Sequence, residues 1–423
     1  MTETPRRARM APVGERASVT PLELFFDLVF VFTLTQVTAL MAADPTLRGL
    51  LRGVLVLSML WWCWVGYAWL GNVVRADEGI VRLVMFAAMI AMFVAAVTIP
   101  EVFDDLPGGL HGPIVLAAAY FAVRLMHLLL FLAASKDDDG LRRQVLRFAP
   151  SMMVGTGLLL VASQFTGPVQ TALWAAALLG DYVGTLLAGA SGWRLRSPSH
   201  FAERHGLVII VALGESIVSI GIGVTALPIS WPIVVASALG LSVCAALWWA
   251  YFDVVALVAE RVLTKASGEQ QARLGRDSYS YLHLPMIIGI VLLALGLKKV
   301  LGYVGGADGH TLADPLYGVP LIALYGGPAL YLLAHVAFRL RNVHTVNRQR
   351  VIGALLLLAL IPVASQLPAL AALGLLTACV CGLIAYEAVR FAEVREKVRH
   401  QEEITTSGAD PQLSADPERT EQT

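Results

Sequence analysis

Twelve long apolar runs constrain this chain more than any other feature of its sequence. A helix needs about 20 mostly apolar residues to cross a hydrocarbon core that is about 30 Å thick. Runs near this length lie at 21–42, 50–73, 80–99, 112–134, 145–165, 169–190, 206–225, 232–257, 278–301, 317–338, 350–366 and 368–391. We therefore expect an all-α integral membrane protein with about 12 transmembrane helices.

The composition supports this expectation and excludes several other classes of protein. Hydrophobic residues make up 57% of the chain and charged residues 15%, against about 45–50% and about 25% in soluble domains. Lys+Arg and Asp+Glu both number 31, so net charge predicts no nucleic-acid partner. The cysteines predict neither a disulfide framework nor a zinc site, because Cys63, Cys244, Cys379 and Cys381 all lie in apolar runs.

The distribution of Lys and Arg predicts the orientation, because cytoplasmic loops carry an excess of these residues. With a cytoplasmic N-terminus, the inside segments hold all of them except Arg48, Arg52, Lys298, Lys299 and Arg124. We therefore expect a multi-pass membrane protein with both termini in the cytoplasm. The predicted parts are a basic segment at 1–20 without a cleavable signal, a transmembrane domain at 21–394, and a disordered polar tail at 395–423.

A weak internal repeat suggests a parallel duplication of six helices, with halves at 21–199 and 200–394. Three local matches, at offsets of 187, 188 and 208 positions, are Leu60-Trp-Trp-Cys-Trp64 with Leu247-Trp-Trp-Ala-Tyr251, Asp27 with Glu215, and His127 with His335. Parallel repeats of this kind are common in transporters. Chance similarity between apolar helices explains the same matches, so the repeat is a hypothesis.

Ionisable side chains inside the predicted helices mark the candidate site. Each one costs roughly 2.5–3.5 kcal/mol on insertion scales, so it needs a partner or a wet cavity. Glu23 and Asp27 are four residues apart, which places both carboxylates on one face of the first helix. The candidates for substrate or ion binding are Glu23, Asp27, Arg124, His127, Asp181, Glu215, Asp253 and His283.

Depth within the predicted helices divides this set. Arg124, Asp181 and Glu215 fall near the centres of their helices, so we expect Arg124 to lie between the two carboxylates at the midplane. The others lie on the cytoplasmic side, which predicts a polar cavity that is open to the cytosol and closed below by the ionic cluster. Two interpretations stay open, because surplus acids in a low-dielectric site can exchange protons, whereas a charge network can also merely fix helix packing.

A second motif, His200-Phe-Ala-Glu-Arg-His-Gly206, is predicted to be a cytoplasmic segment that leads into the seventh helix. Its polar members are His200, Glu203, Arg204 and His205. The spacing is not that of a hydrolytic zinc helix, and no other ligand cluster completes it in sequence, so we expect no metal. The simpler interpretation is a capped helix start in which Glu203 and Arg204 interact with neighbouring inside loops.

Three motifs taken together resemble the bacterial low temperature requirement protein A family. They are Glu23-Leu-Phe-Phe-Asp-Leu-Val-Phe-Val-Phe32, the His200–Gly206 segment running into Ala212-Leu-Gly-Glu-Ser216, and Tyr281-Leu-His-Leu-Pro-Met286. The resemblance covers roughly residues 18–395. It implies a multi-pass bacterial membrane protein of a family named for a cold-growth phenotype, and it implies no particular biochemical activity.

The sequence favours a secondary transporter or proton-coupled permease for an unknown small molecule or ion. Twelve helices, a possible repeat, midplane charges and the lack of a phosphate-binding loop in the sequence fit this function, and they indicate no cofactor. One alternative is a membrane-embedded enzyme for a lipid or isoprenoid, with His127, His205 and His283 as acid–base groups. Another is a non-transporting structural or sensory protein. The lipid bilayer is the expected partner, and the sequence leaves the oligomeric state open.

Overall fold

The computed structural model describes residues 13–14, 17–225, 227–393 and 395–396. Most of the predicted basic segment at 1–20 and nearly all of the predicted disordered tail lie outside these residues. The longer helices are α1 (Pro21–Ala43), α2 (Leu47–Gly71), α3 (Gly79–Val97), α4 (Gly112–Ala134), α5 (Asp139–Ala162), α6 (Gly167–Leu187), α7 (Pro198–Gly223), α8 (Trp231–Phe252), α11 (His283–Val304), α12 (Gly318–Val343), α13 (Arg348–Ala364) and α14 (Ala369–Arg390). The short elements are η1 (Ile99–Glu101), α9 (Val255–Lys265), α10 (Gly268–Leu274), the π-helical turn η2 (Gly275–Tyr281) and η3 (Ala307–Gly309).

Each of the twelve predicted spans overlaps one of the longer helices, so the prediction of an all-α membrane protein is confirmed. In the described part of the chain, ten helical stretches are long and apolar enough to cross a membrane by length and composition. The other two spans are α6 and α13, and α13 has only 17 residues. Five boundaries differ from prediction by five residues or more. Helix α5 begins at Asp139, α7 begins at Pro198, α8 ends at Phe252, α11 begins at His283 after α10 and η2, and α12 ends at Val343.

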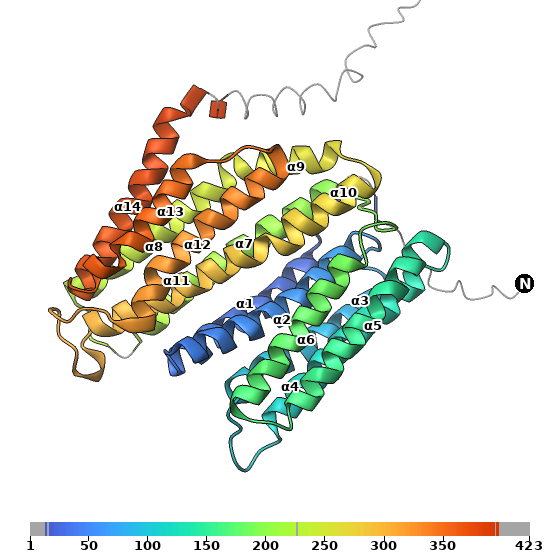
Figure 1. Ribbon diagram of the computed structural model, residues 1–423, viewed down its shortest axis with the longest axis horizontal. Helices are drawn as coiled ribbons and strands as arrows, with labels where there is room; N and C mark the ends of the chain where they lie inside the picture. Colours follow the sequence, from blue (N-terminus) through green and yellow to red (C-terminus); the bar gives the residue numbers. More distant parts are fainter. Residues whose placement is uncertain (1–12, 15–16, 226, 394, 397–423) are drawn as a thin grey trace, which may run out of the picture.

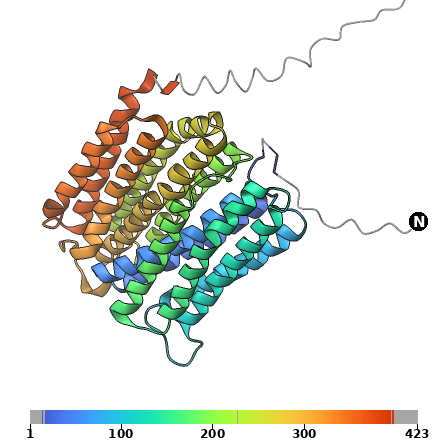
Figure 2. The same ribbon diagram turned by 45° about the vertical axis from the view of Figure 1, so that its right-hand side comes forward.

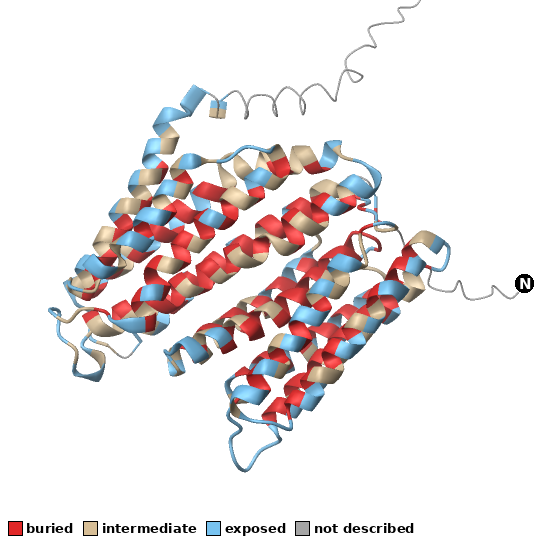
Figure 3. Ribbon diagram, viewed as in Figure 1, coloured by how far each residue is buried: buried red, intermediate tan, exposed pale blue. Residues whose placement is uncertain are grey.

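The helices form a bundle with two sides that follow the order of the chain. In Figures 1 and 2, α1–α6, in blue to green, lie on one side, and α7–α14, in light green to red, lie on the other. Figure 3 shows buried residues on the inward faces of both sides and exposed residues mainly outside. The outward faces carry large apolar side chains such as Leu28, Ile90 and Leu355, as expected for helices that face lipid.

Both sides pack their helices in the same order of neighbours. On the first side α1 packs against α2 and α3, α3 against α4, α4 against α5, α5 against α6, and α2 against α6. On the second side α7 packs against α8 and α11, α11 against α12, α12 against α13, α13 against α14, and α8 against α14. The repeat of six helices stays a hypothesis, in which α9 and α10 would be additions between its second and third helices, because α2 also contacts α4, and α11 also contacts α8 and α14.

The two sides meet where α1 packs against α7 and α11. On the second side, α11 and α12 approach so closely that only glycine fits at their contact. A Cβ atom on Gly289 would lie 2.6 Å from the carbonyl oxygen of Gly327, and one on Gly327 would lie 2.5 Å from the carbonyl oxygen of Gly289. Small residues permit such close backbone contact between membrane helices. The second side is therefore a tightly packed unit behind the α1–α7 contact.

Candidate functional site

The first turns of α1 and α7 together hold a buried group of charged side chains. Thr20 begins α1 with a capping box, in which its hydroxyl accepts from the backbone N–H of Glu23 and the Glu23 carboxylate accepts from the backbone N–H of Thr20. Ser197 precedes α7, and Pro198 takes its first turn, where the missing N–H costs no hydrogen bond. Because both helices start at the same end of the bundle, their first turns lie side by side.

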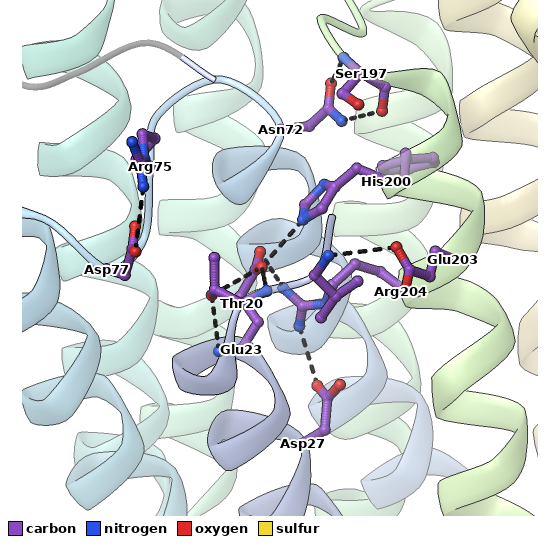
Figure 4. Close-up of polar contacts among 12 residues, drawn as sticks. Thr20, Glu23, Asp27, Asn72, Arg75, Asp77, Ser197, His200, Glu203 and Arg204 are labelled. Atoms are coloured by element: carbon purple, nitrogen blue, oxygen red, sulfur yellow. Dashed lines mark hydrogen bonds and ion pairs between the residues drawn. The ribbon is translucent and has the colours of Figure 1, made fainter. Parts of the chain in front are cut away.

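The α1–α7 cluster consists of Glu23, Asp27, His200 and Arg204 (Figure 4). The Arg204 guanidinium donates from Nη1 to Glu23 Oε1 at 2.8 Å and from Nη2 to Asp27 Oδ1 at 3.0 Å. His200 Nε2 lies 3.0 Å from Glu23 Oε2. All four side chains are at most 2% exposed. The cluster is therefore a sealed ionic contact between the two sides of the bundle.

Helix α2 holds this cluster in place from a third direction. The indole N–H of Trp64 donates to Asp27 Oδ1 at 2.7 Å, and the Arg204 guanidinium lies over the Trp64 ring, 5.4 Å from its centre. Asn72, just after α2, donates to the carbonyl of Ser197 at 2.6 Å and accepts from the backbone N–H of Arg196. The start of α7 is thus fixed by the end of α2 (Figure 4).

The charge of the α1–α7 cluster depends on one proton. Two carboxylates face one guanidinium, so a net negative charge remains while His200 is neutral. A buried net charge is costly unless it is paired. A proton on His200, or on one carboxylate, makes the cluster neutral. Burial of the α1–α7 cluster and its protonation therefore depend on each other.

The His200–Gly206 motif is a helix start, as the simpler sequence-based interpretation expected. It forms the first turns of α7, and most of its side chains are buried. The sequence count recognised one central arginine, Arg124, whereas Arg204 is a second buried arginine that pairs with α1. Of the motif's polar members only Glu203 is exposed, and it accepts from the backbone N–H of Val19 at 3.3 Å. The expected contact of Glu203 with a neighbouring segment is therefore confirmed.

The helix starts also correct the proposed matching of the two halves. Thr20 and Pro21 correspond to Ser197 and Pro198, so Glu23 matches His200 and Asp27 matches Arg204, both 177 positions apart. At this offset Glu215 matches Thr38 and not Asp27. Equivalent positions on α1 and α7 thus carry acids on one helix and bases on the other, and the two sets pair across the contact.

The predicted midplane group is only partly formed. Arg124 on α4 donates from Nη2 to Asp181 Oδ2 on α6 at 2.9 Å, and both side chains are buried, so this half of the prediction is confirmed. Glu215 does not join them, and that half is wrong. Glu215 accepts from the hydroxyl of Thr35 on α1 and from the hydroxyl of Ser219 at 2.8 Å, because this face of α7 packs on α1.

The remaining candidates lie in separate places. His127 is buried against Gly66 and lines a cavity of about 60 Å³ with Arg124, Trp62 and Trp69, room for only a few water molecules. His283 Nε2 lies 2.9 Å from the Tyr251 hydroxyl oxygen. The ring centre of His283 lies 5.2 Å from that of His205. Both histidines are fully buried.

Asp253 lies outside these groups, at the end of α8. Arg395 donates to Asp253 Oδ1 at 2.7 Å, and Asp253 lines a cavity of about 560 Å³ between α8, α9, α12 and α14. The expectation of one polar cavity that collects all candidates is therefore wrong, because the cavities that hold Arg124 and Asp253 belong to different sides of the bundle. Among the described residues, no group of three or more His, Cys, Asp or Glu side chains is placed to hold a metal ion.

Sequence reasoning missed several members of these sites. Trp64, Thr35 and Ser219 hold Asp27 or Glu215 in the structure, and the sequence analysis used Trp64 only as part of a repeat match. A hydroxyl on a membrane helix gives no sequence signal of its own, because it often bonds to a carbonyl of its own helix, and Trp64 is one of several tryptophans in α2. The signal that could have identified Arg204 was its position one turn after His200, in a helix whose start is marked by Ser197 and Pro198.

Comparisons with known protein sequences found matches over most of the chain. The sequence model described as "Bacterial low temperature requirement A protein (LtrA)" matches residues 18–385. A curated protein from Rhizobium meliloti (strain 1021), named "Uncharacterized protein RA0937", is 28% identical over 330 residues, which cover 73% of this chain and 74% of that protein. No solved structure matches this chain significantly.

Proposed function

This chain belongs to the bacterial low temperature requirement A family, and we propose that it is a proton-coupled secondary transporter of the bacterial inner membrane. The observation that carries the proposal is the α1–α7 cluster, which joins the two sides of the bundle at the end predicted to face the cytoplasm. Alternating access in secondary transporters is largely a rocking of one half against the other around a central site. A sealed contact between the halves is the part that has to open in such a motion.

We infer that the α1–α7 cluster is the cytoplasmic gate and is closed in this structure. Arg204 contacts both Glu23 and Asp27, so separating α1 from α7 breaks two ion pairs and the His200 contact together. Opening then exposes four groups to water, which hydrates them and offsets much of the lost pairing. Two states of similar free energy are what alternating access requires.

Protonation couples to this gate through charge balance. In the closed gate, one proton on His200 or a carboxylate neutralises the excess negative charge. When the gate opens, water stabilises the carboxylates as anions and the proton can leave to the cytosol. Closing the gate without a proton buries a net charge. Gate movement therefore carries a proton, with Asp27 and Glu23 as the acids that make it necessary.

Glu215 provides the second proton-accepting position in this proposal. Its contacts are with the hydroxyls of Thr35 and Ser219, and a hydroxyl can donate to a carboxylate or accept from a carboxylic acid. Glu215 has no ion pair within the described part of the chain, although Lys298 lies near enough to interact electrostatically. It lies further from the cytoplasmic end of α7 than Arg204, on the same helix contact.

The first test is transport itself. Purified protein is reconstituted into proteoliposomes that contain a pH-sensitive dye, and inorganic cations, amino acids and carboxylic acids are added in turn with and without an imposed pH gradient. We expect at least one class to move protons in the wild type, and Asp27→Asn to abolish this movement while the protein stays folded. Asp137→Asn, which changes an exposed acid before α5, is the matched control. A folded Asp27→Asn protein with full activity contradicts the proposal.

The second test needs no substrate. Spin labels at Lys136→Cys and Lys265→Cys, in a background without Cys63, Cys244, Cys379 and Cys381, report the distance between the predicted cytoplasmic ends of the two sides. We expect two distance populations whose ratio changes with pH in the wild type and in Asp137→Asn, and a ratio that no longer changes in Asp27→Asn. One population at every pH would mean that the cluster is a packing device and not a gate.

The enzyme alternative receives less support. It would use His127, His205 and His283 as acid–base groups, but His205 and His283 are fully enclosed by aromatic side chains. A substrate needs direct contact with its acid or base. Neither of these histidines lines the cavities described above.

A further inference from the structure

A cavity of about 560 Å³ lies between α8, α9, α12, α13 and α14, far along the chain from the α1–α7 cluster. Its volume falls in the range of about 300–1,000 Å³ that is typical of small-molecule sites. The lining is mixed, with apolar side chains from α9 on one side and polar groups from the end of α12 on the other. Nothing in the proposed transport mechanism uses it.

The lining charges leave one arginine without an acid. Arg350 donates from Nε and Nη2 to the Glu387 carboxylate at 2.9–3.2 Å. Arg395 pairs with Asp253. Arg339 donates from Nε to the Thr345 hydroxyl at 2.9 Å and forms no ion pair within the described part of the chain. The cavity therefore has a surplus positive charge, with guanidinium donors available to an anion.

A buried polar atom in the same wall lacks a partner. Asn342 is 6% exposed; its Nδ2 donates to the carbonyl of Phe338, and its Oδ1 has no hydrogen-bond partner among the described residues. An unpaired buried acceptor is costly. Asn342 lines the cavity, but this oxygen is enclosed by the protein, so Asn342 adds a polar group to the wall without offering Oδ1 to an occupant.

The rim of the cavity is apolar and placed at one end of the bundle. Trp249 and Phe391 line it and are 41% and 38% exposed. Helix α9 adjoins it and lies at the upper end of the bundle in Figure 1, near the end of α12. This is the end predicted to face the cytoplasm, where exposed tryptophan side chains sit at the level of lipid headgroups.

We propose that this cavity binds an anionic amphiphile, whose charged group lies at Arg339 and whose apolar chain leaves past Trp249 and Phe391. A phospholipid of the cytoplasmic leaflet with an anionic headgroup has this chemistry. Basic pockets between transmembrane helices on the cytoplasmic side are known to hold such headgroups. The site is independent of the proton gate.

The test titrates detergent-purified full-length protein with short-chain phosphatidylglycerol, short-chain phosphatidylcholine, and glycerol 3-phosphate, and follows thermal stability. We expect phosphatidylglycerol to stabilise the wild type more than phosphatidylcholine. Arg339→Gln should bind phosphatidylglycerol about tenfold more weakly, as expected for one lost charge-assisted contact. Arg348→Gln, an exposed arginine at the start of α13 that does not line the cavity, should bind as the wild type does.

A second pair of variants tests occupancy without changing charge. Val258→Trp fills the cavity from α9 and should abolish the preference for phosphatidylglycerol, whereas Leu257→Trp, next to it on α9 and not in the lining, should retain it. Equal stabilisation by both lipids, or wild-type binding by Arg339→Gln or Val258→Trp, would overturn the proposal. Stabilisation by glycerol 3-phosphate as strong as that by the lipid would assign the site to a soluble anion and would also overturn it.

Discussion

Replacement of Arg204 by leucine is the sharpest test of how the two sides of the bundle are held together. The substitution removes the guanidinium that contacts Glu23 at 2.8 Å and Asp27 at 3.0 Å, in a site that is closed to water. Removing one partner of a buried ion pair costs about 3–5 kcal/mol, because the remaining charge is left uncompensated. We expect a loss of this size in the free energy of unfolding of Arg204→Leu.

A double variant separates charge from packing. In Arg204→Leu two carboxylates share one possible positive charge, on His200, so the cluster stays negative. In Arg204→Leu/Asp27→Asn one carboxylate, Glu23, faces a protonated His200 at 3.0 Å, and the cluster can be neutral. We therefore expect the second substitution to restore about 2 kcal/mol, within the usual range of coupling between contacting residues.

The measurement is equilibrium unfolding in mixed micelles, followed by tryptophan emission, for wild type, both single variants and the double variant. Arg142→Leu removes an exposed arginine at the start of α5 and should change stability by less than about 0.5 kcal/mol. A double variant no more stable than Arg204→Leu would refute the charge argument and leave only lost packing as the cause.

Further predictions concern the midplane pair, the glycine contact and the orientation. Arg124→Leu strands the Asp181 carboxylate and should lower stability by about 3–5 kcal/mol in the same assay, with recovery in Arg124→Leu/Asp181→Leu. Gly289→Ala places a Cβ atom 2.6 Å from the carbonyl oxygen of Gly327 and should cost about 1–3 kcal/mol, whereas Gly382→Ala, which meets no atom within 4 Å, should be close to neutral. Reporter fusions after positions 45, 108 and 228 should report the outside, and fusions after 140, 194 and 345 the cytoplasm; an inside signal at 108 would contradict the topology.

The spans were predictable from sequence because crossing a bilayer leaves a long apolar signal in each helix. The signal weakens where polar groups belong to the helix itself. The first turns of α7 contain His200, Glu203, Arg204 and His205, so hydropathy placed its start at 206, although Pro198 behind Ser197 is a helix-start pattern. Similarly, α10 and η2 extend the helical region before α11 with polar residues that a hydropathy window excludes.

The sequence was enough to predict which ionisable residues are buried, but not which of them contact one another. Unusual depth identified Glu23, Asp27, Arg124, Asp181 and Glu215, and each is buried in the structure. Depth along a helix axis gives no information about the direction in which a side chain points. Arg124 and Glu215 both lie near the centres of their helices, yet Arg124 faces α6 whereas Glu215 faces α1.

Glu23 belongs both to the N-terminal cap of α1 and to the ionic contact between α1 and α7. One of its oxygens accepts from the backbone N–H and hydroxyl of Thr20, which closes the end of α1, and also lies 3.0 Å from His200, while the other accepts from Arg204. A displacement of α7 therefore changes the forces on the Glu23 carboxylate, which caps the start of α1. Fraying of the first turn of α1 and separation of the two sides should then be one cooperative event. Amide hydrogen exchange at Thr20, Glu23 and Leu24, whose N–H groups are bonded in this turn, should follow the same opening equilibrium as the contact with α7.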